Sequence, residues 1–214
     1  MIPDPAKFYD EVYCKIGGSI TAVEQAMYGA PHQKERRDKI LKVLKAETQP
    51  GMDALDLGCA GGWFTAVLAA TCKSVVGVDV VPWLIVQAPK FDNVTYMVAD
   101  WNDLDFPDGT FDLIFATSVF EHEPEVDRLA ARTYAWLRPG GKLIASVPVS
   151  EELLTPDKAF AVITPDEART AGQGSGHVHA FRPETFKELL EKHGWTLTQG
   201  YSDGIYYLVV GVKP

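Results

Sequence analysis

The stretch from Asp53 to Phe64, which reads DALDLGCAGGWF, constrains the fold of this chain more than any other. A short apolar run alternates with an acid, breaks into glycines and resumes as an apolar segment. This pattern is typical of a buried strand, a tight turn and the N-terminus of a helix. Glycine has no Cβ, so the backbone of such a turn can approach a ligand closely. The stretch therefore predicts either a ligand-binding turn or a strand–helix connection that needs glycine for its geometry alone.

The spacing of the small residues distinguishes two ligand classes. Dinucleotide-binding turns carry a third glycine five residues after the first, for close packing of the helix on the strand. Here the first glycine is Gly58 and the position five residues later is Trp63, which argues against a nicotinamide-dependent oxidoreductase. Small residues stand instead at alternate positions, Gly58, Ala60 and Gly62, after the acid Asp56.

Composition indicates which binding partners and which cellular compartment we expect for this chain. The length of 214 residues suits one α/β domain, and the net charge of −9 disfavours nucleic acid as a partner. No apolar run reaches the roughly 20 residues of a membrane span, and we expect no signal peptide. Its cysteines, Cys14, Cys59 and Cys72, are odd in number and lack the spacing of a zinc site. We expect a cytoplasmic monomer or homodimer that binds neither nucleic acid nor membrane.

Short apolar runs alternate with helical patterns along most of the chain. This alternation predicts a parallel sheet with helices on both faces, ending in an antiparallel pair joined by a short turn. The expected helices cover Trp63–Thr71, a segment that begins at Pro82, residues 126–137 and Pro183–His193, with a turn at 138–141. The expected strands are Ala54–Leu57, Ser74–Val80, Val94–Ala99, Phe111–Ala116, Lys142–Val147, Trp195–Gln199 and Ile205–Val212.

Polar groups and turns follow the carboxyl ends of successive strands. Ligands of parallel sheets bind at these ends, where the strand order reverses. The rule places the turn at 58–62, Asp79, Asp100 and the segment after Ala116 along one edge of the sheet. Taken alone, either acid could be a solvated strand-end residue. Their coincidence with the glycine turn favours a binding site.

Two segments flank this framework within the one domain expected over residues 1–214. Residues 1–47 have helical patterns and form an expected N-terminal cap, in which Tyr9 and Tyr13 could line a pocket or belong to the core. Residues 150–176 are rich in acidic residues, proline and glycine, and we expect an inserted flap there. The C-terminal helix and strand pair follow it.

Three histidines are candidate polar groups of a site. His177 and His179 alternate with Phe181, so an extended chain would place all three side chains on one side. His122 follows the fourth expected strand. Each histidine could be a general base or a packing residue. A metal bound by the His-x-His pair has no third ligand fixed by spacing, so none is expected.

Together these motifs give the chain a family resemblance over residues 50–212. It resembles the class I S-adenosylmethionine (SAM)-dependent methyltransferases, and within them the small-molecule group that includes quinone-biosynthesis and natural-product enzymes. The matching motifs are LDLGCAGG at 55–62, VGVD at 76–79, VAD at 98–100, FDLI at 111–114 through FEH at 120–122, and LRPGG at 137–141.

The resemblance implies an α/β fold, a Rossmann-like αβα sandwich with a seven-stranded, mostly parallel sheet whose last strand is antiparallel. It implies SAM as cofactor and S-adenosylhomocysteine as product. Asp79 would accept hydrogen bonds from the ribose hydroxyls, Asp100 would meet the adenine amino group, and the turn would hold the methionine part. Asp56 would orient the turn or the ammonium group. The implied cofactor-binding residues are Asp56, Gly58, Cys59, Ala60, Gly62, Asp79, Val80, Asp100, Trp101, Thr117 and Ser118.

The resulting hypothesis is methyl transfer from SAM to a small-molecule acceptor by in-line displacement. Oxygen is the first expected acceptor atom and nitrogen the second, and a non-catalytic SAM-binding subunit is a further alternative. A hydroxyl acceptor needs a base, which His122, His177 or His179 would supply. Tyr9, Tyr13 and Phe181 would form the apolar walls of the acceptor pocket.

Overall fold

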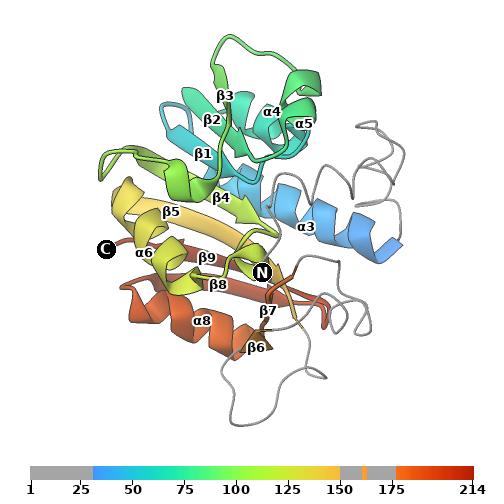
Figure 1. The fold of residues 1–214 in the computed structure, drawn as a ribbon, viewed down its shortest axis with the longest axis vertical. Helices are drawn as coiled ribbons and strands as arrows, with labels where there is room; N and C mark the ends of the chain where they lie inside the picture. Colours follow the sequence, from blue (N-terminus) through green and yellow to red (C-terminus); the bar gives the residue numbers. More distant parts are fainter. Residues whose placement is uncertain (1–30, 150–160, 163–176) are drawn as a thin grey trace. The chain divides into compact units, whose positions relative to one another are not determined.

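The structure of this chain is a computed structural model that describes residues 31–149, 161–162 and 177–214 (Figure 1). The strands of its main sheet are β1 (Asp53–Leu57), β2 (Ser74–Asp79), β3 (Val94–Val98), β4 (Phe111–Thr117), β5 (Leu137–Pro148), β8 (Thr196–Ser202) and β9 (Tyr206–Val212). They form one seven-stranded sheet in the order β3-β2-β1-β4-β5-β9-β8. The strand β9 runs antiparallel to both of its neighbours. The expected fold class, including the antiparallel last strand, is confirmed.

The chain divides into two compact units, Met1–Asp105 and Phe106–Pro214. The expectation of one domain over residues 1–214 stays a prediction. None of the helices in the described ranges is both long and apolar enough to cross a membrane.

In the first unit, apolar strands carry short helices on their faces (Figure 1). β1 pairs in parallel with β2, and β2 with β3. Apart from Asp56, the residues that β1 buries are apolar, as expected for a central strand. Within the described residues of this unit, the helices are α3 (Pro31–Glu47), α4 (Trp63–Ala69), α5 (Pro82–Gln87) and the 3₁₀ turn η1 (Trp101–Asp103). α4 packs on β1 and β2, and α5 packs on β2 and β3.

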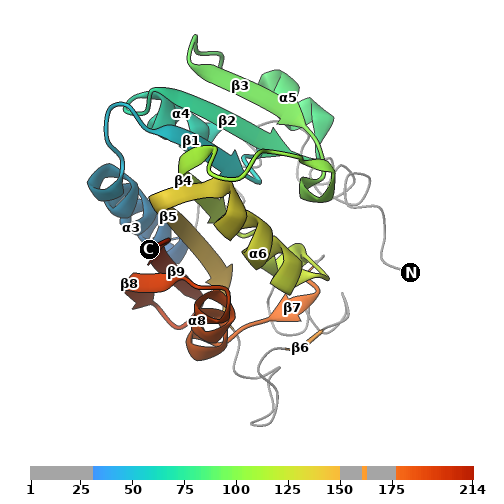
Figure 2. The same cartoon turned by 90° about the vertical axis from the view of Figure 1, so that its left-hand side faces the viewer.

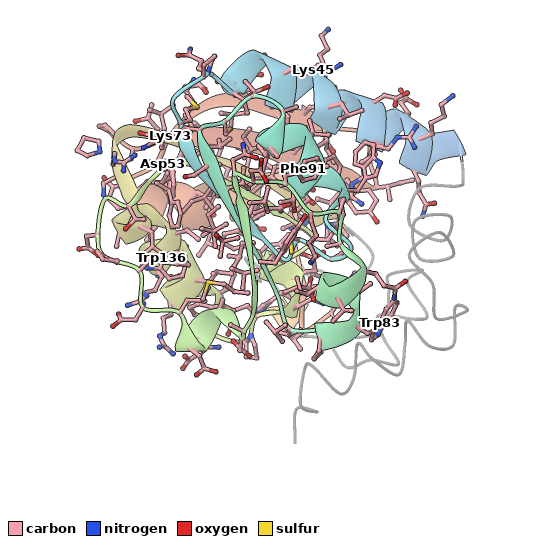
Figure 3. All side chains as sticks on the ribbon, turned by 90° about the horizontal axis from the view of Figure 1, so that it is seen from above. Lys45, Asp53, Lys73, Trp83, Phe91 and Trp136 are labelled. Carbon is pink, nitrogen blue, oxygen red and sulfur yellow. The ribbon has the colours of Figure 1, made fainter. Side chains whose placement is uncertain are left out.

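The amino ends of β1 and β2 are joined by polar contacts. Asp53 accepts a hydrogen bond of 2.7 Å from the Ser74 hydroxyl, and its Oδ1 lies 3.4 Å from Lys73 Nζ. Figure 3 shows Asp53 and Lys73 beside each other. This end of the strands is the one opposite to the glycine turn.

The part of the second unit that the structure describes contains β4, β5, β8 and β9 with two packed helices. These are α6 (Val126–Trp136) and α8 (Pro183–Lys192), which contact β5 and β8 respectively and also each other (Figure 2). The 3₁₀ turn η2 (Phe120–His122) follows β4. Two short strands, β6 (Ala161–Val162) and β7 (His179–Ala180), pair antiparallel in a separate sheet that the sequence patterns did not predict.

The turn predicted at residues 138–141 lies inside β5, so the prediction of a strand beginning at Lys142 is wrong. The register with β4 explains the difference. Phe111 pairs with Leu137, but Leu113 pairs with Lys142, so residues 138–141 form a bulge within the strand. Gly140 donates a 2.7 Å hydrogen bond to the Lys213 carbonyl, which joins the bulge to the chain after β9.

Polar contacts of Asp127 join α6 to the end of α8. Asp127 Oδ1 on α6 lies 2.6 Å from Lys192 Nζ and 2.9 Å from His193 Nε2 at the end of α8. The hydrogen bond from Lys192, followed by that from His193, lowers the pKa of the Asp127 carboxyl. The side chain of His193 is half-buried.

Replacing Asp127 should therefore have a small, pH-dependent effect on stability. The folded carboxyl has a lowered pKa, so its contribution is present above the unfolded pKa and is lost as pH falls through the folded pKa. Because the Asp127 side chain is 47% exposed, Asp127→Asn should lower the free energy of unfolding by less than about 1 kcal/mol near neutral pH. Urea denaturation at neutral and acidic pH measures this. Asp92→Asn at an exposed position is the control. An equal loss at both pH values would contradict the explanation.

Candidate functional site

The turn after β1 has an unusual backbone conformation at alternate residues. Gly58, Ala60 and Gly62 have φ angles of 72°, 46° and 79°, all in the left-handed region. Ala60 is not a glycine, and this conformation costs an alanine roughly 1–2 kcal/mol. Strain of this kind is typical of binding sites, where the surrounding structure must hold it in place.

The carboxylate of Asp79 holds this turn. Asp79 is the last residue of β2, and its Oδ2 accepts a 2.8 Å hydrogen bond from the Ala60 amide. Its Oδ1 accepts a 2.9 Å bond from Val81, and the Val80 amide also faces the carboxylate. Burial raises the pKa of Asp79, and these amides oppose that rise. Each carboxylate oxygen has a second lone pair, so the group can still accept hydrogen bonds from a ligand.

The backbone also connects the turn to β2. The amides of Gly58 and Cys59 both donate to the Val78 carbonyl at 2.9 Å. Cys59 is buried, and its burial, followed by the negative charges of Asp56 and Asp79, raises the pKa of the thiol. The thiol therefore stays protonated at neutral pH and packs as a small apolar group.

Asp56 and Thr65 form a buried hydrogen bond between β1 and α4. The Thr65 hydroxyl donates to Asp56 Oδ2 at 2.6 Å, and both residues are buried. Burial raises the pKa of Asp56 to about 7, although the bond from Thr65 lowers it. The bond fixes the start of α4 against the strand that precedes the turn.

Tyr96 is a part of this region that sequence reasoning missed. It lies opposite Gly77 in the register of β2 and β3. A Cβ on Gly77 would lie 2.9 Å from the Tyr96 ring, and a Cβ on Gly62 would lie 2.5 Å from its hydroxyl. The hydroxyl is buried, and burial raises the pKa of Tyr96 to about 12. The tyrosine therefore fills the space that two glycines leave open.

The end of β3 lies beside the end of β2. The Ala99 amide donates to the Asp79 carbonyl at 3.0 Å, so Asp79 and Asp100 follow adjacent, paired strand ends as predicted. Asp100 Oδ1 accepts bonds from the backbone and side-chain nitrogens of Asn102 at 2.9 and 3.1 Å. Trp101, the first residue of η1, is buried.

In the second unit, the chain leaves β4 through a second strained residue. Thr117 ends the strand, and Ser118 has a positive φ of 55°. The Ser118 amide donates to the Ser146 carbonyl at 2.8 Å, which holds this conformation against β5. The expected position of Thr117 and Ser118 beside the methionine part of SAM stays a prediction.

Two of the three predicted histidines lie together, next to a buried carboxylate. The rings of His122 and His177 are 4.8 Å apart between centroids. Glu121 is fully buried, and its Oε1 lies 3.8 Å from His122 Nε2. The Val178 amide donates to the Glu121 carbonyl at 2.8 Å, which fixes the segment before β7 against η2. Sequence reasoning did not identify Glu121 as a neighbour of these two histidines.

The three histidines differ in accessibility and basicity. The side chain of His122 is 22% exposed, whereas His177 and His179 are 8% and 1% exposed. Burial, followed by the charge of His122, lowers the pKa of His177 to about 3. Burial also lowers the pKa of His179. His122 is therefore the most accessible of the three.

The residues predicted to form the apolar walls of the acceptor pocket lie in different parts of the chain. Phe181 is fully buried and packs on Phe186 of α8, with ring centroids 5.2 Å apart. Its ring also lies 5.9 Å from that of His179. Tyr9 and Tyr13 lie outside the described residues, as does most of the flap expected at 150–176. All three wall assignments stay predictions.

Comparison with known families identifies the chain. Residues 30–199 match the family described as a methyltransferase domain. The chain belongs to the methyltransferase domain family. This confirms the expected class I SAM-dependent methyltransferases, with SAM as their cofactor, and rules out the oxidoreductase alternative.

Two individual proteins resemble this chain over about half of its length. A sterol 24-C-methyltransferase from Yarrowia lipolytica is 30% identical over 117 residues, which are 51% of this chain and 31% of that protein. A ubiquinone biosynthesis O-methyltransferase from Coxiella burnetii is 34% identical over 112 residues, 50% of this chain and 48% of that protein. The chain thus spans between about a third and a half of these two relatives.

A solved structure shares the fold of this methyltransferase-family chain. The crystal structure of a SAM-dependent methyltransferase from Mesorhizobium loti matches with a TM-score of 0.66 at 19% identity. The match covers 81% of this chain and 96% of that one. At this identity the likeness shows the fold alone.

The contact between Gly62 and Tyr96 can be tested with a matched glycine. Gly62→Ala adds both the cost of a positive φ and a clash with the Tyr96 hydroxyl, whereas Gly51→Ala adds only the first. Gly51 also has a positive φ, but a Cβ there meets nothing within 4 Å. Gly62→Ala should lower the free energy of unfolding and the affinity for SAM more than Gly51→Ala, which should cost about 1–2 kcal/mol of stability.

Urea denaturation and calorimetry measure these two effects. Adding Tyr96→Phe to Gly62→Ala removes the hydroxyl and should recover part of both losses. Equal effects of the two glycine substitutions, or no recovery in the double variant, would show that the tyrosine does not crowd the turn.

Proposed function

We propose that this protein transfers the methyl group of SAM to a small-molecule acceptor. The observation that carries the proposal is the hydrogen bond between the Asp79 carboxylate and the strained turn at Ala60, at paired strand ends in a chain of this family. The two relatives described above are named for methyl transfer to a sterol and in ubiquinone biosynthesis, which supports a small-molecule acceptor.

In this proposal the first unit binds SAM. The free lone pairs of Asp79 accept hydrogen bonds from the ribose hydroxyls, which a carboxylate does well. Asp100 meets the adenine amino group with Trp101 near the ring. The backbone of the turn, with the amides at the start of α4, holds the methionine part. Asp56 orients the turn through Thr65.

The chemical step requires little from the protein beyond alignment. The sulfonium of SAM is already a strong electrophile, so the site must align the acceptor atom, methyl carbon and sulfur in line and exclude water. The acceptor atom forms a bond to the methyl carbon, and the carbon–sulfur bond breaks. Its electron pair stays on sulfur, which leaves S-adenosylhomocysteine. A hydroxyl acceptor must also lose its proton.

Oxygen is the proposed acceptor atom, with nitrogen second. The relatives include both a C- and an O-methyltransferase, so membership of the family leaves the atom open. The cluster of imidazoles in the second unit favours oxygen, because an amine needs no strong base whereas a hydroxyl does. Of the three histidines, His122 is the one proposed to take the proton, since His177, with a pKa of about 3, is a weak base near neutrality.

Calorimetry with SAM tests the proposed cofactor site. Asp79→Asn removes the negative charge that accepts hydrogen bonds from the turn and, in this proposal, from the ribose. A hydrogen bond to a charged group contributes about 1.5–3 kcal/mol. The affinity for SAM should fall by about 10- to 150-fold, because each 1.36 kcal/mol is a factor of ten. Asp53→Asn, at the opposite end of the strands, should bind SAM like the wild type. Binding of NAD in place of SAM, or equal SAM affinity of both variants, would refute this site.

A turnover assay tests the proposed acceptor. Incubation with SAM and a set of phenols and amines should release S-adenosylhomocysteine with a phenol. His122→Ala should lower this turnover about 10²–10⁴-fold and leave SAM affinity nearly unchanged. Turnover with amines alone would reverse the order of oxygen and nitrogen. A complete lack of turnover would favour a non-catalytic SAM-binding subunit.

A further inference from the structure

Glu121, His122 and His177 bring three metal-ligating groups together in the second unit. One ligand atom from each residue lies within 4.8 Å of the others. Two of these residues come from η2 and the third from the segment before β7. The hydrogen bond from the Val178 amide to the Glu121 carbonyl holds the two segments together.

Aromatic packing fixes both of these segments in the core. Phe120, next to Glu121, is fully buried, and its ring lies 5.2 Å from that of Phe186 on α8. Phe181, which follows β7, packs on the same Phe186 ring at 5.2 Å. The three ligating groups therefore stand on segments anchored to one helix, which is the rigid support that a metal site needs.

The donor set selects the kind of ion. One carboxylate and two imidazoles are the ligands of catalytic zinc sites and of other divalent transition-metal sites that keep a coordination position open. Magnesium and calcium prefer oxygen ligands throughout, so they fit two imidazole nitrogens poorly. Cys59 and Cys72 belong to the first unit, and neither is a member of this cluster.

The distances suit an ion after a small adjustment of the side chains. With metal–ligand bonds of 2.0–2.2 Å, the ligand atoms around a tetrahedral ion lie about 3.4 Å apart. His122 Nε2 and Glu121 Oε1 are already 3.8 Å apart. A divalent ion at this site would compensate the charge of the buried Glu121 carboxylate.

We propose that Glu121, His122 and His177 bind one divalent transition-metal ion, with zinc the best match, and leave a position open for an oxygen of the acceptor. This deepens the function proposed above and rests on it for the acceptor. A bound ion lowers the pKa of a coordinated hydroxyl. The hydroxyl proton leaves to solvent, the oxygen forms a bond to the methyl carbon, and the carbon–sulfur electron pair stays on sulfur. In this form of the mechanism the ion replaces His122 as the group that activates the hydroxyl, and His122 acts as a ligand of the ion.

Metal titration of the full chain tests the site without an acceptor. After treatment with a chelator, the wild type should bind one Zn²⁺ per chain by calorimetry. It should bind Co²⁺ with the absorption spectrum of a four- or five-coordinate ion. Loss of an outer-shell partner typically weakens a metal site about 10–100-fold. Glu121→Gln and His177→Gln, which remove ligands, should weaken binding by more than that.

His193→Gln is the matched control, because His193 also lies beside a carboxylate, Asp127, in the same unit. It should bind the ion like the wild type. Thermal unfolding without metal checks that each variant folds. Should His177→Gln not fold, His122→Gln, at the most accessible of the three histidines, replaces it. The proposal is overturned if no ion binds at one per chain, or if the ligand variants bind it as tightly as His193→Gln.

SAM calorimetry on the same samples separates this proposal from the proposed function. SAM should bind with and without the ion, since none of the ligands belongs to the first unit. Binding of SAM without any ion site would refute the metal proposal alone. Binding of the ion by a protein that does not bind SAM would refute the proposed function and leave the metal site standing.

Discussion

The hydrogen bond from the Ala60 amide to Asp79 is the interaction on which the candidate cofactor site depends. Three alternate residues of the turn have a left-handed backbone, and a free chain would rarely adopt that conformation. The carboxylate stabilises it from the end of the adjacent strand at 2.8 Å. This bond stabilises the turn without the help of a ligand, and a preformed site loses less conformational entropy on binding.

Much of this arrangement follows from local sequence signals. The strands around Asp56 and Asp79 are apolar runs that end in turn residues, and the parallel topology brings the ends of β2 and β3 to one edge. The helix over residues 126–136 follows from its amphipathic spacing. These features could be predicted because each depends on residues close together in the chain or on a general rule of topology.

Other features depend on register and on contacts between distant segments, which no local pattern encodes. Tyr96 fits against Gly62 only because β3 pairs with β2 in one register. In the sequence, Glu121 is a single acidic residue with no sign of a function. It lies near His177 because a backbone hydrogen bond holds the segment before β7 against η2. Likewise, residues 138–141 have the composition of a turn, and the pairing with β4 makes them a bulge.

The strain at Ala60 has a consequence for how such chains can change in evolution. An alanine with positive φ is tolerated there because its amide bonds to a carboxylate, and such a charged bond outweighs a conformational cost of roughly 1–2 kcal/mol. A chain that lost the acid at position 79 would retain the cost without the bond. Glycine at position 60 would then be selected. Positions 60 and 79 are therefore expected to covary, with alanine tolerated only where the acid is present.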